Sequence, residues 1–526
     1  ILNAEKNEKD NDKTGDKKDG ANANESENME DSKIPTNVIV LPLYAMLPQH
    51  RQLKVFDAVS PNTRLIVIST NVAETSITIP GIKYVVDPGR EKARVYDQKT
   101  GASKFEIDWI SKASASQRAG RCGRTGPGHC YRLYSSAMYN DNFQQQLAPE
   151  ILSRPIEDLI LNMKSMFINN IETFPFPTPP NQDEIQHAIS SLQCLGAITP
   201  SINNASDQNS SYSINTMTKK GNNKITHVGE QMALFPLPPR FSKMLLLGLQ
   251  QDDLIAYTIS LVASLSVQSP FLGEISKKFK HTESDALRLL RVVGAYSYAV
   301  ENSNTNNKKQ AAKSFCKKYQ LHARTMYEIQ RLRRQLKNII TRTLVNNESS
   351  GKISTNITNA LNLPPPTEKH ETLLLQLVGA SFIDRIARLA PVGTWVEADE
   401  NRKRMRCAYQ SCNLKLANKP LWIHASSGVV SKDFRRLPRY VVYQEIIETS
   451  KPYMVRVTAI SEDIIARLGR GTPMVEFSAP LDAPLPSYDA TLDRVVCTSK
   501  PTFGPHRWEL PATRIPINET SSVSPG

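Results

Sequence analysis

Short apolar runs bounded by Pro, Asn or Gly begin at residue 38. Three of them are rich in β-branched residues: residues 38–44, 63–70 and 83–87. Continuous apolar runs of this length are typical of parallel strands that are buried on both faces. Residues 49–59 lie between the first two runs and have a helical apolar stripe at Leu53, Phe56 and Val59. The pattern therefore predicts a βαβ unit with buried strands.

Helical periodicity and Pro-rich joints dominate residues 149–360. Residues 149–240 predict a small helical domain, which a polar segment rich in Asn and Ser interrupts at residues 200–224. Residues 241–360 predict a helical bundle, and its last helix has one apolar packing stripe: Ile329, Leu332, Leu336 and Ile339. Four basic residues off this stripe form either a solvated face or an RNA contact: Arg324, Arg331, Arg334 and Lys337.

Strand-like patterns replace the helices after a Pro-rich linker. They recur between residues 393 and 458, and predict a small β-barrel over residues 361–470. The oligonucleotide-binding (OB) fold is the leading interpretation, and another compact β domain is the alternative. The tail, residues 471–526, is rich in Pro and polar residues, with one dense cluster, FGPHRWELP, at residues 503–511.

Charge is distributed unevenly along the 526 residues, a length that indicates several domains. Lys and Arg number 65 against 51 Asp and Glu, a net charge of +14. Residues 1–33 hold ten acidic and six basic residues and no aromatic one, so we expect a disordered acidic insertion there, with +18 on the remainder. That excess favours a nucleic acid partner. No apolar run approaches the ~18 residues of a membrane span, so no membrane partner is predicted.

The strongest chemical signal is SASQRAGRCGRTGPG at residues 114–128. If a helix runs through it from residue 116, Gln117, Arg121 and Arg124 share one face, with glycines between them that remove side-chain bulk. Such a face suits a polyphosphate whose terminal group gains charge during hydrolysis. A solvated Arg-rich helix would not explain glycines that cost about 1 kcal/mol each inside a helix. We therefore expect these three residues to be catalytic.

A second signal, ISTNVAETSITIPG at residues 68–81, follows a predicted strand directly. Ligands of open α/β sheets bind at the carboxyl ends of strands, where Thr70, Asn71 and Thr78 would present polar groups. Such groups suit phosphate oxygens and read no base sequence. A loop rich in Ser and Thr is weak evidence by itself.

Together these segments resemble the second RecA-like domain of DEAH-box RNA helicases. LPLYAMLP at residues 41–48 is similar to motif IV of that family. We call residues 69–81 the motif V segment and residues 117–124 the motif VI segment, after the motifs that they resemble. The resemblance covers residues 34–460.

The resemblance implies a nucleotide site and an RNA site. For ATP, it implies that Gln117, Arg121 and Arg124 contact the γ-phosphate and the attacking water, that Phe56 stacks on adenine and that Thr78 approaches the ribose. The family usually has an acidic residue at the position of Pro80, so a carboxylate contact to the ribose is not expected here. For RNA, it implies backbone contacts from Thr70 and Asn71, and from a β-hairpin at residues 87–110 through Arg90, Lys92 and Arg94.

The resemblance also names the domains. The expected class is a multidomain chain of α/β, α and β parts: a RecA-like domain 2 at residues 34–148, a winged helix at 149–240, a helical bundle or ratchet at 241–360, an OB fold at 361–470 and a C-terminal extension at 471–526.

Half of an ATP site is missing from the sequence. It contains neither a GxxxxGK[ST] loop nor a DEAH box, and seven scattered cysteines without a CxxC pair predict no metal site or disulfide framework. Because residue 1 is Ile rather than Met, we expect a fragment. The ligands of Mg²⁺ are then expected in a first RecA domain outside this chain, and the chain alone should not hydrolyse ATP.

The expected function is that of an ATP-dependent RNA helicase translocating 3′ to 5′. The closing segment PSYDATLDRVVCTSKPTFGPHRWELP at residues 486–511 and the acidic insertion are most similar to family members of ribosome biogenesis, which remove U3 small nucleolar RNA from pre-ribosomal RNA in the small-subunit processome. That implies pre-rRNA, snoRNA, a pre-ribosomal particle and a protein coactivator as partners, and location in the nucleus and nucleolus. The alternative is a non-catalytic RNA- or protein-binding scaffold, against which the intact motif VI segment argues.

Overall fold

The computed structural model describes residues 37–517, except for 46, 61, 76, 98–100, 200–222, 274–278, 280, 304–306, 346–363, 392–393, 395–406, 417, 432 and 491–492. The insertion predicted at residues 1–33 and nearly all of the polar segment 200–224 lie outside the described residues. The chain divides into two compact units. Unit 1 comprises residues 1–91 and 109–146, and unit 2 comprises residues 92–108 and 147–526.

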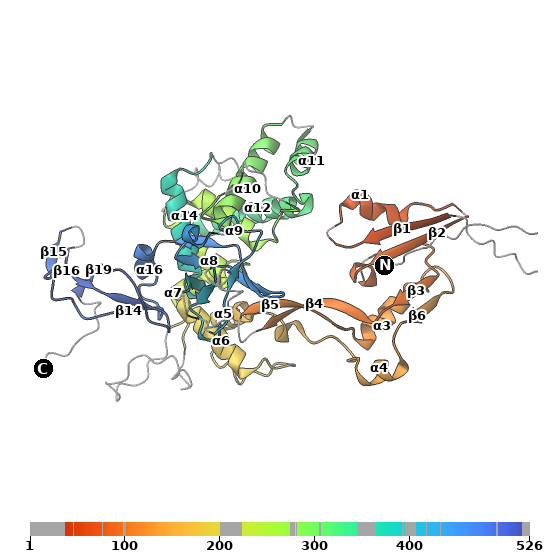
Figure 1. Ribbon diagram of the computed structural model, residues 1–526, viewed down its shortest axis with the longest axis horizontal. Helices are drawn as coiled ribbons and strands as arrows, with labels where there is room; N and C mark the ends of the chain where they lie inside the picture. Colours follow the sequence, from red (N-terminus) through yellow and green to blue (C-terminus); the bar gives the residue numbers. More distant parts are fainter. Residues whose placement is uncertain are drawn as a thin grey trace, which may run out of the picture. The chain divides into compact units, whose positions relative to one another are not determined.

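Two pairs of parallel strands form unit 1 (Figure 1). β1 (Asn37–Leu43) pairs with β2 (Thr63–Ser69), and β3 (Tyr84–Asp87) pairs with β6 (His129–Arg132). Parallel pairing across a helical connection confirms the predicted βαβ unit. Four short helices complete the unit: α1 (Gln49–Gln52), α2 (Val72–Thr75), α3 (Lys112–Ala119) and α4 (Ser136–Asp141).

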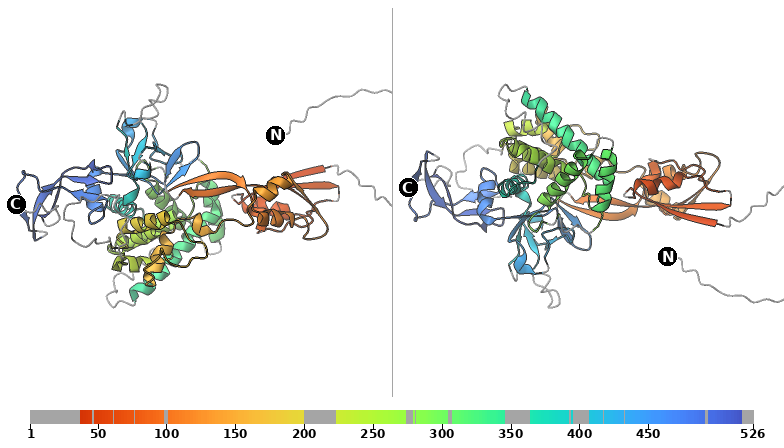
Figure 2. Two further views of the ribbon diagram at one scale, coloured as in Figure 1. Left: turned by 90° about the horizontal axis from the view of Figure 1, so that it is seen from below. Right: turned by 90° about the horizontal axis from the view of Figure 1, so that it is seen from above.

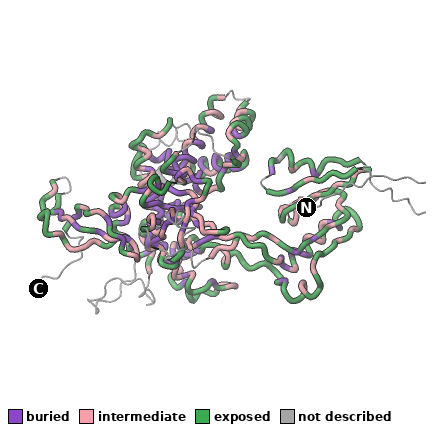
Figure 3. Tube along the Cα trace, viewed as in Figure 1, coloured by how far each residue is buried: buried purple, intermediate pink, exposed green. Residues whose placement is uncertain are grey.

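The burial predicted for these strands is wrong. Val38, Ile68 and Val86 are 57%, 66% and 62% exposed, and most of β1 and β2 is drawn as exposed in Figure 3. Sheets of two strands with short helices are too narrow to cover both strand faces. The described residues therefore supply the parallel pairing of a RecA-like sheet without its covering layers.

The helix predicted at residues 49–59 is also shorter than expected. α1 is followed by a single 3-10 turn, η1 (Leu53–Phe56), and Asp57 then adopts an extended conformation. Val55 is buried, whereas the predicted stripe is exposed: Leu53, Phe56 and Val59. The extended residue at 57 ends the helical stretch after about two turns, so Val59 lies beyond it and the predicted stripe does not form one buried face.

The predicted hairpin is present, and it joins a larger sheet. β4 (Arg90–Asp97) and β5 (Ala102–Trp109) are neighbours, and β5 pairs in parallel with β11 (Glu445–Glu448). β12 (Pro452–Val455) and β9 (Trp422–Ile423) complete the sheet in the order β4-β5-β11-β12-β9. The outer part of the hairpin therefore belongs to unit 2, and the chain passes between the units within β4 and β5.

Helices fill the centre of unit 2, as predicted. The first group follows η2 (Glu150–Leu152) and consists of α5 (Glu157–Ser165), α6 (Gln182–Cys194) and α7 (His227–Ala233). The second consists of α8 (Pro239–Leu249), α9 (Ile255–Ser266), α10 (Asp285–Glu301), α11 (Lys308–Lys318) and α12 (Ala323–Val345). α9 lies against both α10 and α12 (Figure 2). The predicted stripe of α12 packs into the core, with Ile329 and Leu336 fully buried.

A β-rich part follows α14 (Glu368–Ser381). Its second sheet has the order β13-β10-β7-β8, formed by β7 (Ile386–Leu389), β8 (Tyr409–Ser411), β10 (Tyr440–Val442) and β13 (Thr458–Ile460). Short 3-10 turns among the described residues here are η6 (Ile383–Arg385), η8 (Leu414–Leu416) and η9 (Phe434–Arg436). The strands predicted between residues 393 and 458 are thus largely confirmed.

The described residues of the C-terminal extension, 471–490 and 493–517, contain strands. They follow α16 (Glu462–Leu468) and form two small sheets, one of β14 (Val475–Phe477), β17 (Pro501–Phe503) and β18 (Trp508–Glu509), and one of β15 (Ser487–Asp489), β16 (Arg494–Ser499) and β19 (Thr513–Pro516). The cluster FGPHRWELP anchors the extension, because Phe503 and Trp508 are buried in the same core as Tyr440 of the OB part. None of the described helices combines the length and the apolar character that crossing a bilayer requires.

Candidate active site

Helix α3 carries the start of the motif VI segment and ends within it. Ser111 caps the helix by accepting a hydrogen bond from the Ser114 N–H at 3.0 Å, and Gly120 closes it. The expectation that Gln117, Arg121 and Arg124 share one helical face is therefore wrong, since only Gln117 lies in the helix. α3 ends at Ala119 with Gly120 as its C-cap, so the two arginines are presented from the turns that follow.

The motif V segment holds Arg121 through main-chain oxygens. The guanidinium donates to the Ile77 carbonyl at 3.2 Å and also to the Glu74 carbonyl. Its Nε is buried without a hydrogen-bond partner among the described residues. Burial and the neighbouring Arg124 charge lower the pKa of Arg121, and Glu74 opposes this. Its hydrogen bonds to the motif V segment therefore go to neutral acceptors.

Arg124 contacts the same segment through a side chain. Its Nη1 donates to the Thr78 hydroxyl at 3.0 Å, and both residues are exposed. The structure thus brings together three of the residues that the sequence assigned to ATP: Arg121, Arg124 and Thr78. Neither guanidinium forms an ion pair within the described part of the chain, so both charges remain available to an anionic ligand.

The predicted RNA-gripping residues lie at the carboxyl end of β2, the edge where parallel sheets bind ligands. Thr70 and Asn71 are exposed, and their carbonyls accept from Ala73 and Glu74 at the start of α2. Their hydroxyl and amide groups can therefore meet phosphate oxygens. Gln117 and Phe56 are exposed as well, but no contact brings either one to the arginines.

Gly128 lies between the motif VI segment and β6, where the chain passes close to two carbonyl groups. A Cβ at this position would lie 2.2 Å from the Cys122 carbonyl oxygen and 2.7 Å from that of Lys83. Only glycine lets the chain pass between them, and the next residue, His129, then donates to the Lys83 carbonyl at 2.8 Å to begin β6. The turn with the two arginines is thereby fixed to the parallel sheet.

The sequence reasoning missed Arg118. Its Nε donates to Glu74 Oε2 at 2.9 Å and its Nη1 to Asp87 Oδ1 at 3.0 Å, so it is paired with two carboxylates. The three side chains are 14%, 10% and 0% exposed. The signal that could have found this network was the Glu inside AETS, an acidic residue with no role in phosphate binding.

Asp87 organises the end of β3. One carboxylate oxygen also accepts from the Gly89 N–H at 2.9 Å, and the other from the Tyr134 hydroxyl at 3.3 Å. Burial, together with the Asp87 charge, raises the pKa of Tyr134 to about 12. This arrangement is a structural anchor beside the site, because its donors and acceptors are already satisfied.

The basic residues of the hairpin are engaged in different ways. The Arg90 guanidinium lies 3.2 Å from the Trp109 ring centroid, and Lys92 Nζ lies 5.0 Å from the Phe105 centroid. Arg94 forms an ion pair with Glu445 of β11 and donates to the Ser103 hydroxyl at 2.9 Å. Arg94 is therefore partly neutralised, and Lys92 is the more available cation of the two in unit 2.

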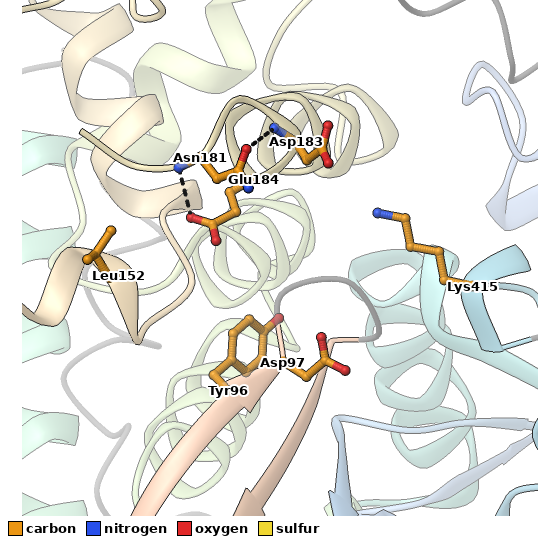
Figure 4. A pocket seen from close by; sticks show the side chains of 7 residues that line it. All are labelled: Tyr96, Asp97, Leu152, Asn181, Asp183, Glu184 and Lys415. Atoms are coloured by element: carbon orange, nitrogen blue, oxygen red, sulfur yellow. Dashed lines mark hydrogen bonds between the residues drawn. The ribbon is translucent and has the colours of Figure 1, made fainter. Parts of the chain in front are cut away.

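A cavity of about 200 Å³ lies elsewhere in unit 2 and contains none of the predicted residues (Figure 4). Tyr96 and Asp97 from β4 face Asn181 and Glu184 at the start of α6. Glu184 already accepts from the Asn181 N–H at 3.3 Å within a capping box. Among the described residues, no group of three or more His, Cys, Asp or Glu side chains could hold a metal ion.

Three protein families match the chain in succession. Residues 17–126 match the helicase conserved C-terminal domain, residues 238–324 the helicase associated domain (HA2), ratchet-like, and residues 374–472 the oligonucleotide/oligosaccharide-binding (OB)-fold. The first match begins inside the segment interpreted as an insertion. Together the three define the C-terminal domain set of a helicase.

Proteins named as ATP-dependent RNA helicases or as probable ones match two thirds or more of the chain. The ATP-dependent RNA helicase DEAH13 of Arabidopsis thaliana is 34% identical over 94% of the chain and 40% of its own length. The probable ATP-dependent RNA helicase DHX37 of Homo sapiens is 38% identical over 93% of the chain and 41% of its own length. The probable ATP-dependent RNA helicase DHR1 of Saccharomyces cerevisiae is 39% identical over 67% of the chain and 29% of its own length. The chain therefore carries the C-terminal region of the DEAH-box RNA helicase family, and spans about 40% of the length of the first two relatives.

Proposed function

We propose that this chain is the C-terminal part of an ATP-dependent RNA helicase, with Arg121 and Arg124 as its arginine fingers. One observation carries the proposal. Arg118 is neutralised by two carboxylates, whereas Arg121 and Arg124 contact only carbonyl and hydroxyl oxygens. Of these three arginines, the latter two keep a positive charge available for a phosphate.

The residues present fit a nucleotide. ATP supplies a γ-phosphate that gains negative charge during hydrolysis, and fixed guanidinium groups stabilise that charge. We assign this role to Arg121 and Arg124, and assign to Gln117 the orientation of the attacking water. Phe56, 40% exposed at the end of η1, would cover the adenine. Mg²⁺ and the phosphate-binding lysine require a further RecA-like domain, so the chain alone is not expected to hydrolyse ATP.

RNA is the proposed substrate of translocation. Thr70 and Asn71 would grip its backbone at the end of β2, and Arg90, Lys92 and Arg94 would lie along the hairpin. Thr78 and the main-chain carbonyls of the motif V segment hold both fingers. A shift of that segment when RNA binds would therefore change the positions of Arg121 and Arg124 at the nucleotide. Translocation from 3′ to 5′ is proposed from the family resemblance.

The finer proposal is a role in making the small ribosomal subunit. The closing segment at residues 486–511 and the acidic insertion support it, through their resemblance to the family members that release U3 snoRNA from pre-rRNA. A protein coactivator, a pre-ribosomal particle and a nucleolar location belong to the same proposal. Crosslinking in cells tests it: we expect crosslinks at the U3 binding sites of pre-rRNA, and crosslinks spread over messenger RNA would contradict it.

The helicase proposal is tested by ATP hydrolysis in the complete gene product. We expect hydrolysis that RNA stimulates, and its loss when either finger is replaced by alanine. The alternative is a scaffold that binds RNA without catalysis. It predicts RNA binding with no ATP hydrolysis, whatever residue stands at 121 or 124.

A further inference from the structure

We propose that Arg118 is a positioning residue that couples RNA binding to the arginine fingers. It acts through Glu74 rather than by touching either ligand, and the inference rests on the proposed function.

Arg118 bonds to three separate parts of unit 1. It reaches Glu74 in the motif V segment at 2.9 Å, Asp87 at the end of β3 at 3.0 Å and the Arg90 carbonyl at the base of the hairpin at 3.1 Å. The first and third of these segments carry the residues proposed to hold RNA. One side chain at the end of α3 therefore ties both of them to the helix that leads into the fingers.

The bonds of Arg118 to Glu74 and Asp87 are shielded from solvent. Asp87 is fully buried, and Arg118 and Glu74 are only 14% and 10% exposed. Burial opposes a charged guanidinium, but the bonds to Glu74 and Asp87 outweigh it and raise the pKa of Arg118. The planar guanidinium fixes the directions of all three bonds at once, which an ammonium group could not do.

Glu74 is the point where the two networks meet. Its carboxylate accepts from Arg118, and its backbone carbonyl accepts from Arg121. Asn71, proposed to hold RNA, starts the same turn, since its carbonyl accepts from the Glu74 N–H at 2.9 Å. If RNA displaces this turn, either the Glu74 carbonyl that accepts from Arg121 moves relative to α3, or Arg118 resists the displacement.

The geometry predicts how Arg118 affects the response of the fingers to RNA. Arg118 holds the motif V segment and α3 in register, so that RNA binding adjusts Arg121 instead of merely loosening the loop. Without the link, the fingers remain present but no longer respond to RNA. The defect should therefore appear in the ratio of ATP turnover with RNA to that without RNA, more than in RNA affinity.

The test uses the complete gene product and a single-stranded oligoribonucleotide. We would measure kcat and KM for ATP, with and without saturating RNA, for E74Q, R118K, R118Q and the double variant E74Q/R118Q. K112Q is the matched control, because it removes a charge from the same helix, where Lys112 Nζ bonds to the Asn140 carbonyl at 3.1 Å and lies over the Tyr139 ring, away from Glu74 and the fingers.

We expect E74Q and R118Q to lower the stimulation ratio about tenfold, a usual size for coupling between sites. R118K should be intermediate, the double variant should be no worse than R118Q, and K112Q should stay within about twofold of wild type. The inference is overturned if E74Q, with an unchanged melting temperature, keeps the wild-type ratio. E74Q also decides the question if R118Q fails to fold.

Failure of the proposed function would be distinct. It would show as a wild-type protein without RNA-stimulated hydrolysis, or as an R121A variant that keeps it, and either result contradicts the finger assignment on which the inference rests. A stimulated wild type, an inactive R121A variant and a normally stimulated E74Q variant would contradict the role of Arg118 alone.

Discussion

Arg124 donates a hydrogen bond from Nη1 to the Thr78 hydroxyl across 3.0 Å. Arg124 lies in the motif VI segment and Thr78 in the motif V segment, and neither residue belongs to a helix or a strand. Because both are exposed, the bond holds a finger in place without burying its charge. The Thr78 hydroxyl is therefore expected to orient Arg124, in addition to any contact with the nucleotide.

Replacing Thr78 by valine tests this bond. Valine keeps the branched shape and removes the acceptor, so we expect kcat/KM for ATP to fall about tenfold, the value of a hydrogen bond to a charged group. T78S keeps the hydroxyl and should remain close to wild type. Steady-state ATP hydrolysis of the complete gene product measures both, and equal impairment of T78V and T78S would refute the assignment.

The hairpin cations should contribute unequally to RNA binding. Lys92 is exposed over Phe105, whereas the charge of Arg94 is matched by Glu445. We expect K92Q to reduce the slope of log affinity against log salt by about 1, the share of one phosphate contact. R94Q should change the slope less, and E445Q should increase it. RNA titrations of this chain at several salt concentrations measure these slopes. A larger effect of R94Q than of K92Q would contradict the prediction.

Arg240 and Asp384 form a buried clamp within unit 2. Arg240 Nη2 lies 2.7 Å from Asp384 Oδ2 and 2.8 Å from Ser191 Oγ, so α8, α6 and the turn before β7 meet at one guanidinium. D384N leaves that charge buried without its anion, and we expect a loss of ~3–5 kcal/mol in the free energy of unfolding. S191A should cost ~1 kcal/mol. Urea denaturation of this chain compares them, and similar losses for the two variants would refute the clamp.

His281 should make unit 2 sensitive to mild acid. Its Nδ1 accepts from the N–H groups of Glu283 and Ser284, at 3.2 and 3.1 Å, just before α10. Burial and the Arg291 charge lower the pKa of His281, against the opposing effect of Glu371. The folded protein therefore prefers the neutral ring, and its stability falls as pH drops below the ~6.5 of an unfolded histidine toward the lower folded value.

The matching variant is H281N, whose amide oxygen can accept the same bonds without titrating. We expect its melting temperature to change less than that of wild type between about pH 7.5 and about pH 5.5. The dependence should not vanish, since burial also lowers the pKa of His187 and His506. H227N, at an exposed side chain, is the control. An unchanged pH dependence in H281N would rule out His281 as the sensor.

Sequence patterns predicted the long helices well. In α12, Ile329 and Leu336 recur at helical spacing and are fully buried, because a period near 3.6 has one structural interpretation over so many residues. The hairpin was also predictable, but its parallel pairing with β11 was not. That pairing joins residues more than three hundred positions apart, and no local pattern specifies which distant strand a sheet edge meets.

The sequence named candidate residues, of which the structure brings Arg121, Arg124 and Thr78 together, but it did not predict their geometry. Arg121 and Arg124 could be assigned from their spacing, yet the helix that was expected to carry them ends at Ala119. A glycine can remove side-chain bulk from one face of a helix, or it can lie where the helix ends. The sequence alone does not distinguish these two roles. Arg118 was overlooked for the opposite reason, because its partners Glu74 and Asp87 come from segments that only the folded chain brings together.

The most direct measurement of the central claim is RNA-stimulated ATP hydrolysis by the complete gene product, comparing wild type with R121A, R124A and K112Q. If the two arginines are fingers, R121A and R124A lose about 10³-fold or more in kcat, with RNA affinity in the absence of ATP retained. K112Q, a charge removed from the neighbouring helix, should stay near wild type. Wild-type turnover in both R121A and R124A would contradict the account.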